Sequence, residues 1–553
     1  MNKEGRRVKI GYNRISAALL LLLLLSACAV ASHAPDDKAR SDAGAIRIRV
    51  FAQQDPSVDL ATNDFTKELE SRFQVRFDWI AVPSAGAKEK RQISLAGGDY
   101  PDAYILTTYV DQFSQADVLR YGQQGVFLPL NDLIDRYAPN IKAAMQENAR
   151  LRAFNTAPDG NIYGLVGYSE CYHCSYPNKM WINTKWLKQL GLELPRTTEE
   201  FRQVLRAFKT SDPNGNGAAD EIPLSGSIED FGVRVVPFLM NGFIYDDDRT
   251  YLQVRDGKVS LAADKPEWRE GLAFIKSLYD EGLIDPGAFA QNASAFKRIG
   301  ENAPAPILGA GAAMHPDIFV DTGPGNTRGS DYNPLPPLAG PHASYATHVN
   351  IGVTPGAKFV ITNKASKEAQ IALIRMVDYM YTPEGQAFAE TGKEGVDWRR
   401  PFDGERALNP EMEPRFARIP LKIGEKSNNS GWSGMGHFYM PRKYRDSWVQ
   451  GDDIYAPDGY ERRLMEATRL YEGHGPEELL TVESLWIDPE EADELSFLQL
   501  NIKSFVEEHT LQFITGDKRL HEDWESYVSG LRELGADRYV DIMQKAYDAA
   551  PKP

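Results

Sequence analysis

The sequence predicts an α/β protein with more than one domain, and three observations support this. The chain has 553 residues, and at roughly one domain per 100–200 residues this length predicts at least two domains. Strand-like and helix-like patterns alternate between residues 46 and 106, which is typical of a parallel sheet with crossover helices. The alternation resumes after Val166, where we place the start of a second lobe.

The first 27 residues have the pattern of a secretory signal. Five Lys or Arg residues against one Glu give this segment a charge of +4. The uncharged run Ile15–Leu25 is shorter than the ~17–25 residues of a membrane-spanning helix and fits a signal-peptide core. The next residues, 25–28, resemble the bacterial lipobox, in which a cysteine carries a lipid. We expect cleavage before Cys28, its lipidation, and a flexible tether over 28–44; an ordinary signal with a chance cysteine is the alternative.

Composition excludes several function classes. The chain is 42% hydrophobic, which argues against intrinsic disorder. Its net charge is -16, and subtracting the +4 of the signal leaves -20. Nucleic acid needs clustered Lys and Arg to bind its phosphates, so this acidic chain is not expected to bind it, although a local basic cleft stays open as an alternative.

The elements of the first lobe follow from their periodicity. Apolar and basic residues alternate from Ile46 to Val50, and a period of two predicts a strand. Phe65, Leu69 and Phe73 recur every four residues, so a helix is expected next. Apolar runs over 75–82 and 103–106 predict two more strands.

The second lobe and the C-terminus are read in the same way. A strand is expected over 180–186, followed by a helix that opens with the capping box Thr197 and Glu200 and has one apolar stripe. The prolines of 334–341 indicate a hinge, with a strand over 351–361 and a helix over 366–381 after it. Beyond Glu490 the pattern is helical, and two glycines divide it into three helices. Those glycines are Gly516 and Gly535.

Two cysteines remain after Cys28, and they are close in sequence. Outside the cytoplasm Cys171 and Cys174 could close a tight disulfide loop or stay a free structural pair. A thiol oxidoreductase site would need a helix to begin at the first cysteine, whereas strand-like residues follow. Zinc is less favoured because no second pair at ligand spacing exists.

The segment 212–221 has the oxygen side chains of a calcium loop. Oxygen ligands at positions 1, 3, 5 and 9, with glycine at position 6, suit a hard cation. An EF-hand also has glutamate at position 12, where this chain has Pro223, so we expect Glu221 to supply the closing carboxylate. The alternative is a surface turn that binds nothing. The expected ligands of a structural Ca²⁺ are Asp212, Asn214, Asn216, the Ala218 carbonyl, Asp220 and Glu221.

The sequence shows no familiar catalytic motif. It lacks the nucleophile elbow, the P-loop, the zinc-protease helix and the dinucleotide fingerprint. A glycosidase carboxylate pair could still be hidden among 78 Asp and Glu residues, because such pairs are set by space. The 9 Trp, 25 Tyr and 24 Phe include several in polar contexts, which suits stacking on sugar rings without chemistry.

Several segments, taken in order, resemble the family 1 extracellular solute-binding proteins of ABC importers. The long form with the calcium-type loop is similar to alginate-oligosaccharide-binding proteins. The resemblance is carried by the lipobox, the strand-helix start and segments 97–102, 183–187, 212–221, 278–286, 382–386, 394–398 and 513–516.

The resemblance implies a two-lobed fold of the type II periplasmic-binding-protein class, with a hinge and a helical C-terminal extension. The expected first lobe comprises 45–165 and 343–400, and the second comprises 166–342 and 401–553. It also implies a monomer, lipid-anchored on the extracellular face of the membrane, that captures an oligosaccharide and passes it to permease subunits. No bond is made or broken. The rival classes are a secreted glycosidase or lyase and a surface lipoprotein without transport function.

Candidate ligand contacts come from the same comparison and from local context. Trp398 and Glu394 lie in a segment that approaches the cleft in relatives, and core packing or surface charge are their alternatives. Trp268 could stack on the ligand or belong to helix packing. The other candidates are Tyr168 and Glu170 after the hinge, Tyr109 after the third strand, and Trp432 and His437 in a glycine-rich run.

Ligand identity is the last expectation. The acidic chain favours a neutral oligosaccharide over a uronate one. A uronate sugar would need arginines and lysines to converge in the cleft, and the residues that could do so are Arg399, Arg400, Arg442, Lys443 and Arg445.

Overall fold

A computed structural model describes residues 44–55, 57–83, 86–108, 110–323, 325–349, 352–420, 428–480 and 485–550. Residues Ile46–Pro553 form one compact unit. The predicted signal peptide, Cys28, nearly all of the tether and Tyr109 lie outside the described residues. Within the described ranges no helix combines the length and the apolar character needed to cross a membrane.

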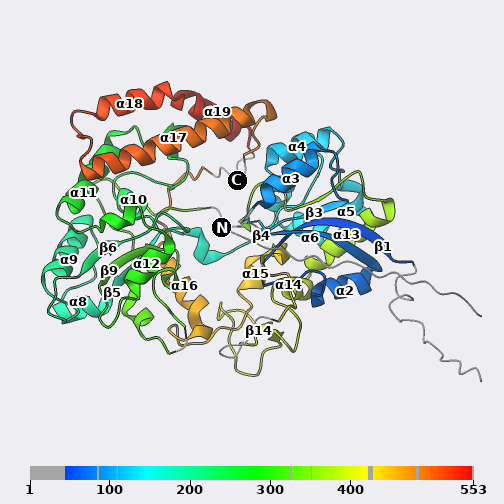
Figure 1. The fold of residues 1–553 in the computed structure, drawn as a ribbon, viewed down its shortest axis with the longest axis horizontal. Helices are drawn as coiled ribbons and strands as arrows, with labels where there is room; N and C mark the ends of the chain where they lie inside the picture. Colours follow the sequence, from blue (N-terminus) through cyan, green and yellow to red (C-terminus); the bar gives the residue numbers. More distant parts are fainter. Residues whose placement is uncertain are drawn as a thin grey trace, which may run out of the picture. The chain divides into compact units, whose positions relative to one another are not determined.

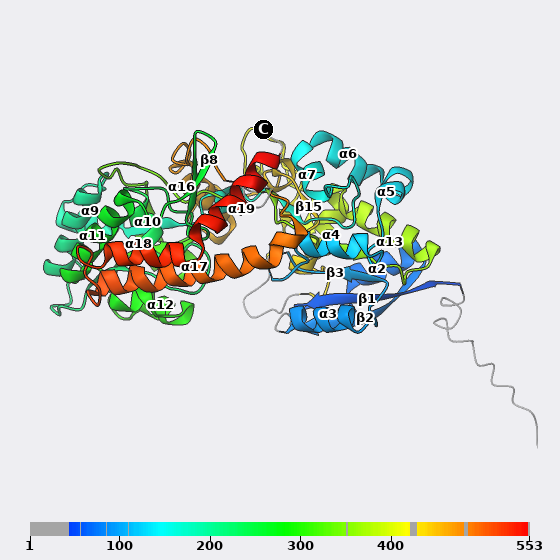
Figure 2. The ribbon, with the colours of Figure 1, turned by 90° about the horizontal axis from the view of Figure 1, so that it is seen from above.

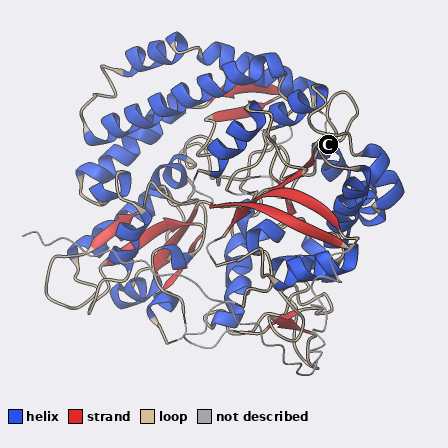
Figure 3. Cartoon of the chain, turned by 45° about the vertical axis from the view of Figure 1, so that its right-hand side comes forward, coloured by secondary structure: helices blue, strands red, loops and turns tan. Residues whose placement is uncertain are grey.

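The first lobe is built on a four-stranded sheet with the strand order β12-β3-β1-β2. Figure 1 labels β1 and β3 of this sheet, and Figure 3 draws all strands in red. β1 is parallel to β2 and β3, whereas β12 enters from a distant part of the chain and is antiparallel to β3. The three strands predicted between residues 46 and 106 are confirmed. Their bounds are β1 (Ile46–Gln54), β2 (Val75–Pro83), β3 (Ala103–Ile105) and β12 (Phe359–Ile361).

The strand predicted over 351–361 is interrupted in the structure. It forms β11 (Gly352–Val353) and β12, with Pro355 and Gly356 between them. Gly356 has a φ of +101°, and a Cβ there would lie 1.7 Å from the carbonyl oxygen of Phe113. Only glycine permits so close a backbone approach in this conformation, which is why one continuous strand cannot form.

The helix α2 (Asp64–Phe73) shows how local sequence and distant packing agree. The Asn63 side chain accepts hydrogen bonds from the Phe65 and Thr66 amides, so it caps the helix start. Phe65 and Leu69, predicted from their spacing, are fully buried under the sheet. The Asn63 amide also donates to the Gly431 carbonyl at 2.8 Å, which ties the helix to a segment far along the chain.

The second lobe is built on the sheet β10-β5-β9-β6. β6 and β9 are parallel, and β5 is antiparallel to both of its neighbours, β9 and β10. The strand predicted over 180–186 ends earlier, because the Asn183 side chain accepts from the Trp186 amide and starts a helix. The bounds are β5 (Lys179–Asn183), β6 (Ile222–Ser225), β9 (Leu308–Ala313) and β10 (Tyr332–Leu335).

The capping box predicted at Thr197 and Glu200 is confirmed at the start of α9 (Thr198–Thr210). The Thr197 hydroxyl accepts from the Glu200 amide at 3.1 Å, and the Glu200 carboxylate accepts from the Thr197 amide at 3.2 Å. The predicted apolar stripe of this helix is buried in the core of the second lobe. Its members are Phe201, Val204, Leu205 and Phe208.

The three C-terminal helices are confirmed as α17 (Pro489–Thr515), α18 (Trp524–Glu533) and α19 (Ala536–Ala549). Gly516 and Gly535 separate them, with φ of +89° and +88°. α17 packs along α11 (Pro266–Asp280) and also contacts α4 (Gln115–Gln123) of the first lobe (Figure 2). The C-terminal extension therefore covers the second lobe and reaches the first.

The remaining helices and strands surround these sheets. The helices are α3 (Ala87–Ala96), α5 (Asn131–Tyr137), α6 (Pro139–Glu147), α7 (Ala149–Asn155), α8 (Thr184–Leu190), α10 (Val235–Met240), α12 (Ala293–Gly300), α13 (Lys367–Met380), α14 (Pro383–Glu390), α15 (Arg442–Arg445) and α16 (Tyr460–Arg469). The strands β7 (Leu252–Arg255) and β8 (Lys258–Leu261) form a hairpin, and β13 (Trp398–Arg399) pairs with β14 (Ala417–Arg418).

A small three-stranded sheet joins chain segments that are far apart in sequence. Its order is β11-β4-β15, where β4 is Tyr168–Ser169 and β15 is Tyr439–Met440. β4 is antiparallel to β11 and parallel to β15. Each of these three strands lies, in sequence, between residues of the first-lobe core and residues of the second-lobe core, so we call this the crossing sheet.

The predicted lobe boundary at residue 400 differs from the packing in the structure. Trp432, Met435 and Phe438 lie in the same hydrophobic cluster as β1 and β3 of the first lobe, not in the clusters of the second. Two long-range backbone bonds, from Asp64 to Asn429 and from Phe65 to Ser430, hold this segment to α2. The segment returns to the first lobe before the chain crosses again, and no local sequence signal marks that return.

A buried lysine fixes the same segment. The Lys358 ammonium is fully buried and donates to the carbonyls of Met435 and His437, each at 2.8 Å. It also lies 4.2 Å from the centre of the Phe438 ring. Because burial disfavours the charged form, the pKa of Lys358 lies well below its ordinary value of 10.5.

Replacing Lys358 by methionine should change how stability depends on pH. An unfolded lysine stays protonated up to its pKa of 10.5, whereas the folded Lys358 loses its proton at lower pH. Between these two values an unfolded Lys358 binds more protons than the folded one, so this residue makes stability rise with pH, by at most ~1.4 kcal/mol per pH unit. In urea unfolding from about pH 7 to about pH 10, stability should therefore rise more steeply for wild type and for the exposed control Lys367→Met than for Lys358→Met. Equal slopes for wild type and Lys358→Met would contradict it.

Candidate functional site

A polar pocket of about 670 Å³ lies at the carboxyl edge of the first sheet. One wall comes from α3, from residues 111–112 after β3, from the start of α4 and from Pro355. The other wall comes from residues 485–499 and from Met543 of the C-terminal extension. Ligands of open α/β sheets bind at the carboxyl ends of the strands, which makes this pocket the candidate site.

A buried ion pair forms the floor of this pocket. Arg91 is 3% exposed and donates to both oxygens of Asp111, at 3.1 and 2.9 Å. Gln53, at the end of β1, accepts from the Thr107 amide at 2.6 Å and donates to Asp111 at 3.4 Å. The Arg91 guanidinium also stacks 4.2 Å from the Phe113 ring centre. The two charges are thus paired and held in place, which gives a rigid polar surface.

Two side-chain amide atoms of residues that line this pocket lack a hydrogen-bond partner among the described residues. Gln112 Oε1, an acceptor, and Gln115 Nε2, a donor, are buried without a hydrogen bond from any described residue. The other end of the Gln112 side chain donates to the Pro355 carbonyl, which fixes its orientation. A buried polar atom without a partner costs about 1–3 kcal/mol. A hydroxyl both donates and accepts, so a polyhydroxylated ligand could satisfy both atoms.

The loop 212–221 is a second candidate site, and its backbone curls around oxygen atoms. Asp212 accepts from the Asn216 and Gly217 amides at 3.1 and 3.0 Å. Asn214 and Asn216 both direct their side chains to Asp220, with N–O distances of 3.0 to 3.2 Å. Gly215 and Gly217 have φ of +70° and +77°, which allows the sharp turn.

The closing carboxylate of this loop has an unsatisfied oxygen. Glu221 Oε1 is buried and has no hydrogen-bond partner among the described residues. Burial raises the pKa of Glu221, and the nearby charges of Asp220 and Asp212 raise it further. Carboxylate and amide oxygens are the ligands that Ca²⁺ prefers, and a cation would offset this crowding of like charges. The donor set therefore fits calcium.

Comparison with known proteins identifies the family. Residues 54–387, more than half of the chain, match the family model described as bacterial extracellular solute-binding protein. The chain belongs to this family. The predicted family is thus confirmed, and with it the expectation of an extracellular binding component of a transporter instead of an enzyme.

Related proteins and solved structures agree with this assignment. The fructooligosaccharide ABC transporter substrate-binding protein FusA of Streptococcus pneumoniae is 29% identical over 493 residues, 87% of this chain and 86% of FusA. A structure of its EF-hand mutant with fructo-nystose has a TM-score of 0.71 at 26% identity, and covers 91% of this chain and 99% of that one.

Two more distant structures share the fold. A solute-binding protein of Bifidobacterium longum infantis, described as HMO binding and ABC-transporter associated, has a TM-score of 0.74 at 21% identity over 91% of this chain and 99% of that one. The alginate-binding protein AlgQ2 without calcium ion has a TM-score of 0.62 at 20% identity, over 91% and 98%. The predicted two-lobed α/β fold of this solute-binding protein is confirmed.

Within this solute-binding protein, Tyr168 and Glu170 come together at the crossing sheet. The Tyr168 hydroxyl donates to Glu170 at 2.6 Å and accepts from the Asn148 amide. Glu170 also accepts from the Arg442 backbone amide. Tyr168 is buried and stacks on Tyr439, with 5.4 Å between ring centres. The pair does not line the polar pocket, and its ligand role remains a prediction.

The structure corrects the prediction for Trp398. It is 2% exposed, packs against Phe416 at 5.2 Å and donates from Nε1 to the Gly392 carbonyl. Its ring is core and is not open for stacking on a sugar. Glu394 is exposed and pairs with Arg400 at 3.0 Å, so the structure gives it the surface charge that was its alternative.

Trp432 is likewise a core residue, which corrects the second tryptophan prediction. It is 1% exposed, meets the edges of the Phe65 and Trp79 rings, and donates to the Thr66 hydroxyl at 2.9 Å. Trp268 is fully buried against Tyr251, which matches helix packing, its alternative; it also lines a separate pocket of about 340 Å³. The glycine-rich or charged residues next to these tryptophans in the sequence suggested exposed rings. In the structure, segments that are distant in sequence cover the rings.

His437 is half-buried beside Glu390, at 3.9 Å, and burial lowers its pKa to about 4. It does not line the polar pocket, and its role stays a prediction. The glycine-rich run that contains it contributes Trp432 and Met435 to the first-lobe core.

The basic residues proposed to receive a uronate are mostly paired with carboxylates. Arg399 pairs with Glu405 at 2.7 Å, and Arg400 pairs with Glu394. Arg442 pairs with Asp446 at 3.2 Å, and Lys443 pairs with Glu147 at 2.9 Å. These four side chains do not converge on one anion site.

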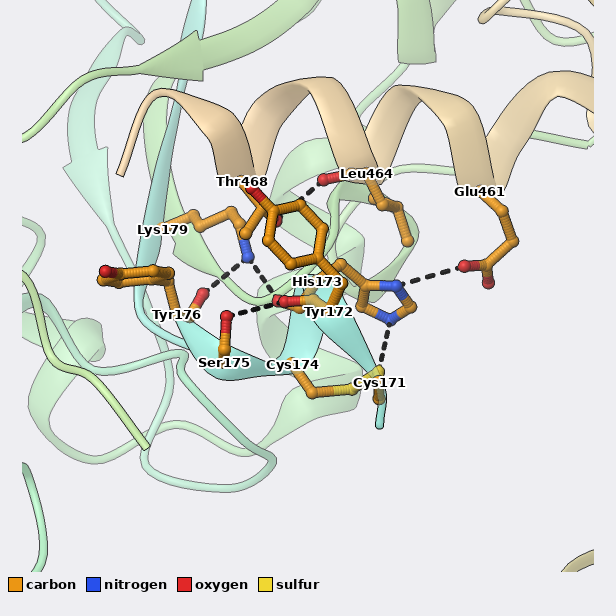
Figure 4. Close-up of a disulfide and its surroundings, with 10 residues drawn as sticks. All are labelled: Cys171, Tyr172, His173, Cys174, Ser175, Tyr176, Lys179, Glu461, Leu464 and Thr468. Atoms are coloured by element: carbon orange, nitrogen blue, oxygen red, sulfur yellow. Dashed lines mark hydrogen bonds and ion pairs between the residues drawn. A yellow bond between two sulfur atoms is a disulfide. The ribbon is translucent and has the colours of Figure 1, made fainter. Parts of the chain in front are cut away.

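Cys171 and Cys174 form a disulfide, which is one of the two states favoured from the sequence (Figure 4). Their Cα atoms are 5.3 Å apart. The bond closes a 3-10 helix over Tyr172–Ser175, directly after β4.

Sequence reasoning missed the residues of the polar pocket. The rule that selected Tyr109, position after the third strand, pointed to the correct edge of the sheet. Applied over a wider window, it would have included Asp111, Gln112 and Gln115. Arg91 gave no signal, because it lies on a helix whose pairing with Asp111 exists only in the folded chain.

Proposed function

We propose that this solute-binding protein captures a neutral oligosaccharide in the polar pocket at the carboxyl edge of the first sheet and delivers it to an ABC importer. The unpartnered Gln112 Oε1 and Gln115 Nε2 carry this proposal, because a small rotation of each side chain into the pocket would offer an acceptor and a donor to sugar hydroxyls. The sugar ligands in the names of FusA and of its structures support the ligand class.

Both walls of the pocket would contact the sugar. The first lobe supplies Asp111, Gln112 and Gln115, and the C-terminal extension supplies Asp493, Ser496 and Gln499. A ligand held by both walls favours the closed arrangement only by its higher affinity for that arrangement. Permease subunits would then recognise the closed, loaded form.

A neutral sugar fits the charges of the pocket better than a uronate. Three basic residues line the pocket, and three aspartates balance their charge. Two of them, Arg91 and Arg120, already pair with Asp111 and Asp117, and the third, Lys88, is exposed. A carboxylated sugar would have to compete with these protein carboxylates, whereas hydroxyls can share their hydrogen bonds.

Binding should depend on the two glutamines. We expect a neutral oligosaccharide, tested in a panel with fructooligosaccharides and uronate oligomers, to raise the unfolding temperature; at 100 times its Kd it adds ~2.7 kcal/mol. Gln112→Ala and Gln115→Ala should each weaken binding at least about tenfold by calorimetry, which is about 1.4 kcal/mol. Each variant removes one hydrogen bond that is shielded from water.

Gln123→Ala is the matched control, because Gln123 is exposed at the end of the same helix α4. It should bind as wild type does. If the two pocket variants bind as tightly as the control, the sugar occupies another site. If no sugar on the panel binds, the ligand class is wrong.

We also propose a structural Ca²⁺ in the loop, held by Asp212, Asn214, Asn216, the Ala218 carbonyl, Asp220 and Glu221. The orphaned Glu221 oxygen and the donor set support it. The ion would screen the loop carboxylates and fix the connection between α9 and β6. The names of the EF-hand mutant of FusA and of calcium-free AlgQ2 indicate the same chemistry in those proteins.

Calcium should raise the unfolding temperature, and chelator should reverse the effect. Asp212→Asn and Glu221→Gln should abolish this difference, since each removes a charged ligand. The exposed Glu193→Gln, on the same lobe, is the control and should respond as wild type does. A calcium response that survives both loop variants would place the ion elsewhere.

We propose that Cys28 carries a lipid that anchors the protein to the extracellular face of the membrane. The basic flank, the short apolar run and residues 25–28 support this. Cells that express Cys28→Ser should release the protein into the medium, whereas wild type should sediment with membranes. Retention of the serine variant on membranes would contradict a lipid at Cys28.

A further inference from the structure

The turn after β4 gathers three side chains that ligate metals. The sulfur atoms of Cys171 and Cys174 and a ring nitrogen of His173 all lie within 4.8 Å of one another. Over the described ranges, no other group of three or more His, Cys, Asp or Glu side chains is gathered in this way. Neither the solute-binding function nor the calcium loop uses this cluster.

The histidine ring is oriented as in a metal site. Its Nε2 lies 3.4 Å from Cys171 Sγ, and its Nδ1 lies 3.1 Å from a carboxylate oxygen of Glu461 on α16 (Figure 4). Metal-binding histidines commonly hold one nitrogen on a carboxylate, which fixes the ring and directs the other nitrogen to the ion. Here the nitrogen that does not contact the carboxylate, Nε2, faces the sulfur atoms.

The turn is held by several independent contacts. The Lys179 ammonium is fully buried and donates to the His173 carbonyl at 2.7 Å. The Ser175 hydroxyl donates to the Tyr172 carbonyl at 2.7 Å, and the Cys174 amide donates to the Cys171 carbonyl at 3.1 Å. None of these contacts involves a sulfur atom, so the turn keeps its scaffold when the disulfide opens.

The two cysteines are separated by two residues, which is also the spacing at which zinc sites use a pair of thiolates. Thiolate and imidazole are the ligands that Zn²⁺ prefers, and three protein ligands leave a fourth position for water or another small ligand. The geometry that closes the disulfide therefore also suits a chelated ion once the sulfur atoms are separate thiolates.

We propose that reduction of the Cys171–Cys174 disulfide converts this segment into a Zn²⁺ site with Cys171 Sγ, Cys174 Sγ and His173 Nε2 as ligands. Two thiol molecules supply two electrons and two protons; they become one disulfide, while the protein S–S bond becomes two thiols. Zn²⁺ then displaces both thiol protons and binds the thiolates. Glu461 is the positioning residue that holds the histidine ring.

The test uses the full chain with Cys28→Ser, so that Cys171 and Cys174 are its remaining cysteines. A phosphine, which binds zinc poorly, reduces the disulfide and is oxidised to its oxide with oxygen from water. Zn²⁺ is then titrated, with Co²⁺ as a coloured probe of thiolate ligation. The reduced chain should bind one more equivalent than either the oxidised chain or the Cys171→Ser/Cys174→Ser variant.

Two further variants, with one control variant, distinguish a metal site that includes His173 and Glu461 from two cysteines that bind zinc alone. Glu461→Gln should keep the stoichiometry and weaken Zn²⁺ binding about 10- to 100-fold, because the ring loses its holder. Glu466→Gln, exposed on the same helix α16, should bind as the parent does. His173→Ala should lose the nitrogen ligand and shift the Co²⁺ spectrum.

Circular dichroism first establishes that each variant is folded. The proposal is overturned if the reduced chain binds no more Zn²⁺ than the double serine variant. It is also overturned if folded His173→Ala binds zinc as tightly as the parent, since the cysteines would then act without the histidine.

Discussion

The arrangement of this solute-binding protein depends on backbone pairing in the crossing sheet. β4, β11 and β15 come from three distant parts of the chain, yet they share one small set of hydrogen bonds. Lys358 adds a second tie, because its buried ammonium satisfies two carbonyls of the segment that leads into β15. The three short strands of the crossing sheet and the buried Lys358 amine therefore hold the segments that connect the two cores in place.

The path of the chain between the two cores also decides which segments line the candidate site. The return of residues 428–440 to the first lobe covers α2 and puts Trp432 into the core. The C-terminal extension, by contrast, lies along α11 and reaches α4, so it closes a wall of the polar pocket. The pocket is therefore shared between the first lobe and a segment more than 350 residues later in the chain.

Local patterns predicted the elements well and the contacts between them poorly. The capping box at Thr197, the apolar spacing of Phe65 and Leu69, and the breaks at Gly516 and Gly535 act within one or two helical turns, so their effects can be read from neighbouring residues. Asn183 shows the limit at short range: its side chain starts a helix where apolar residues predicted continued strand. For the tryptophans, burial is set by segments that meet only in the folded chain, so local context could not decide between ligand contact and core.

The sequence by itself determined the α/β class, the order of elements and the oxygen-rich loop, because these depend on periodicity, capping and the spacing of side chains along the chain. The family followed from the resemblance of several segments taken in order. The tertiary structure alone decided the pairing of Arg91 with Asp111, the unpartnered Oε1 of Gln112 and Nε2 of Gln115, and the direction of the His173 ring toward Cys171. Each of these contacts depends on the distance between side chains that meet only after the chain has folded, so local sequence does not reveal it.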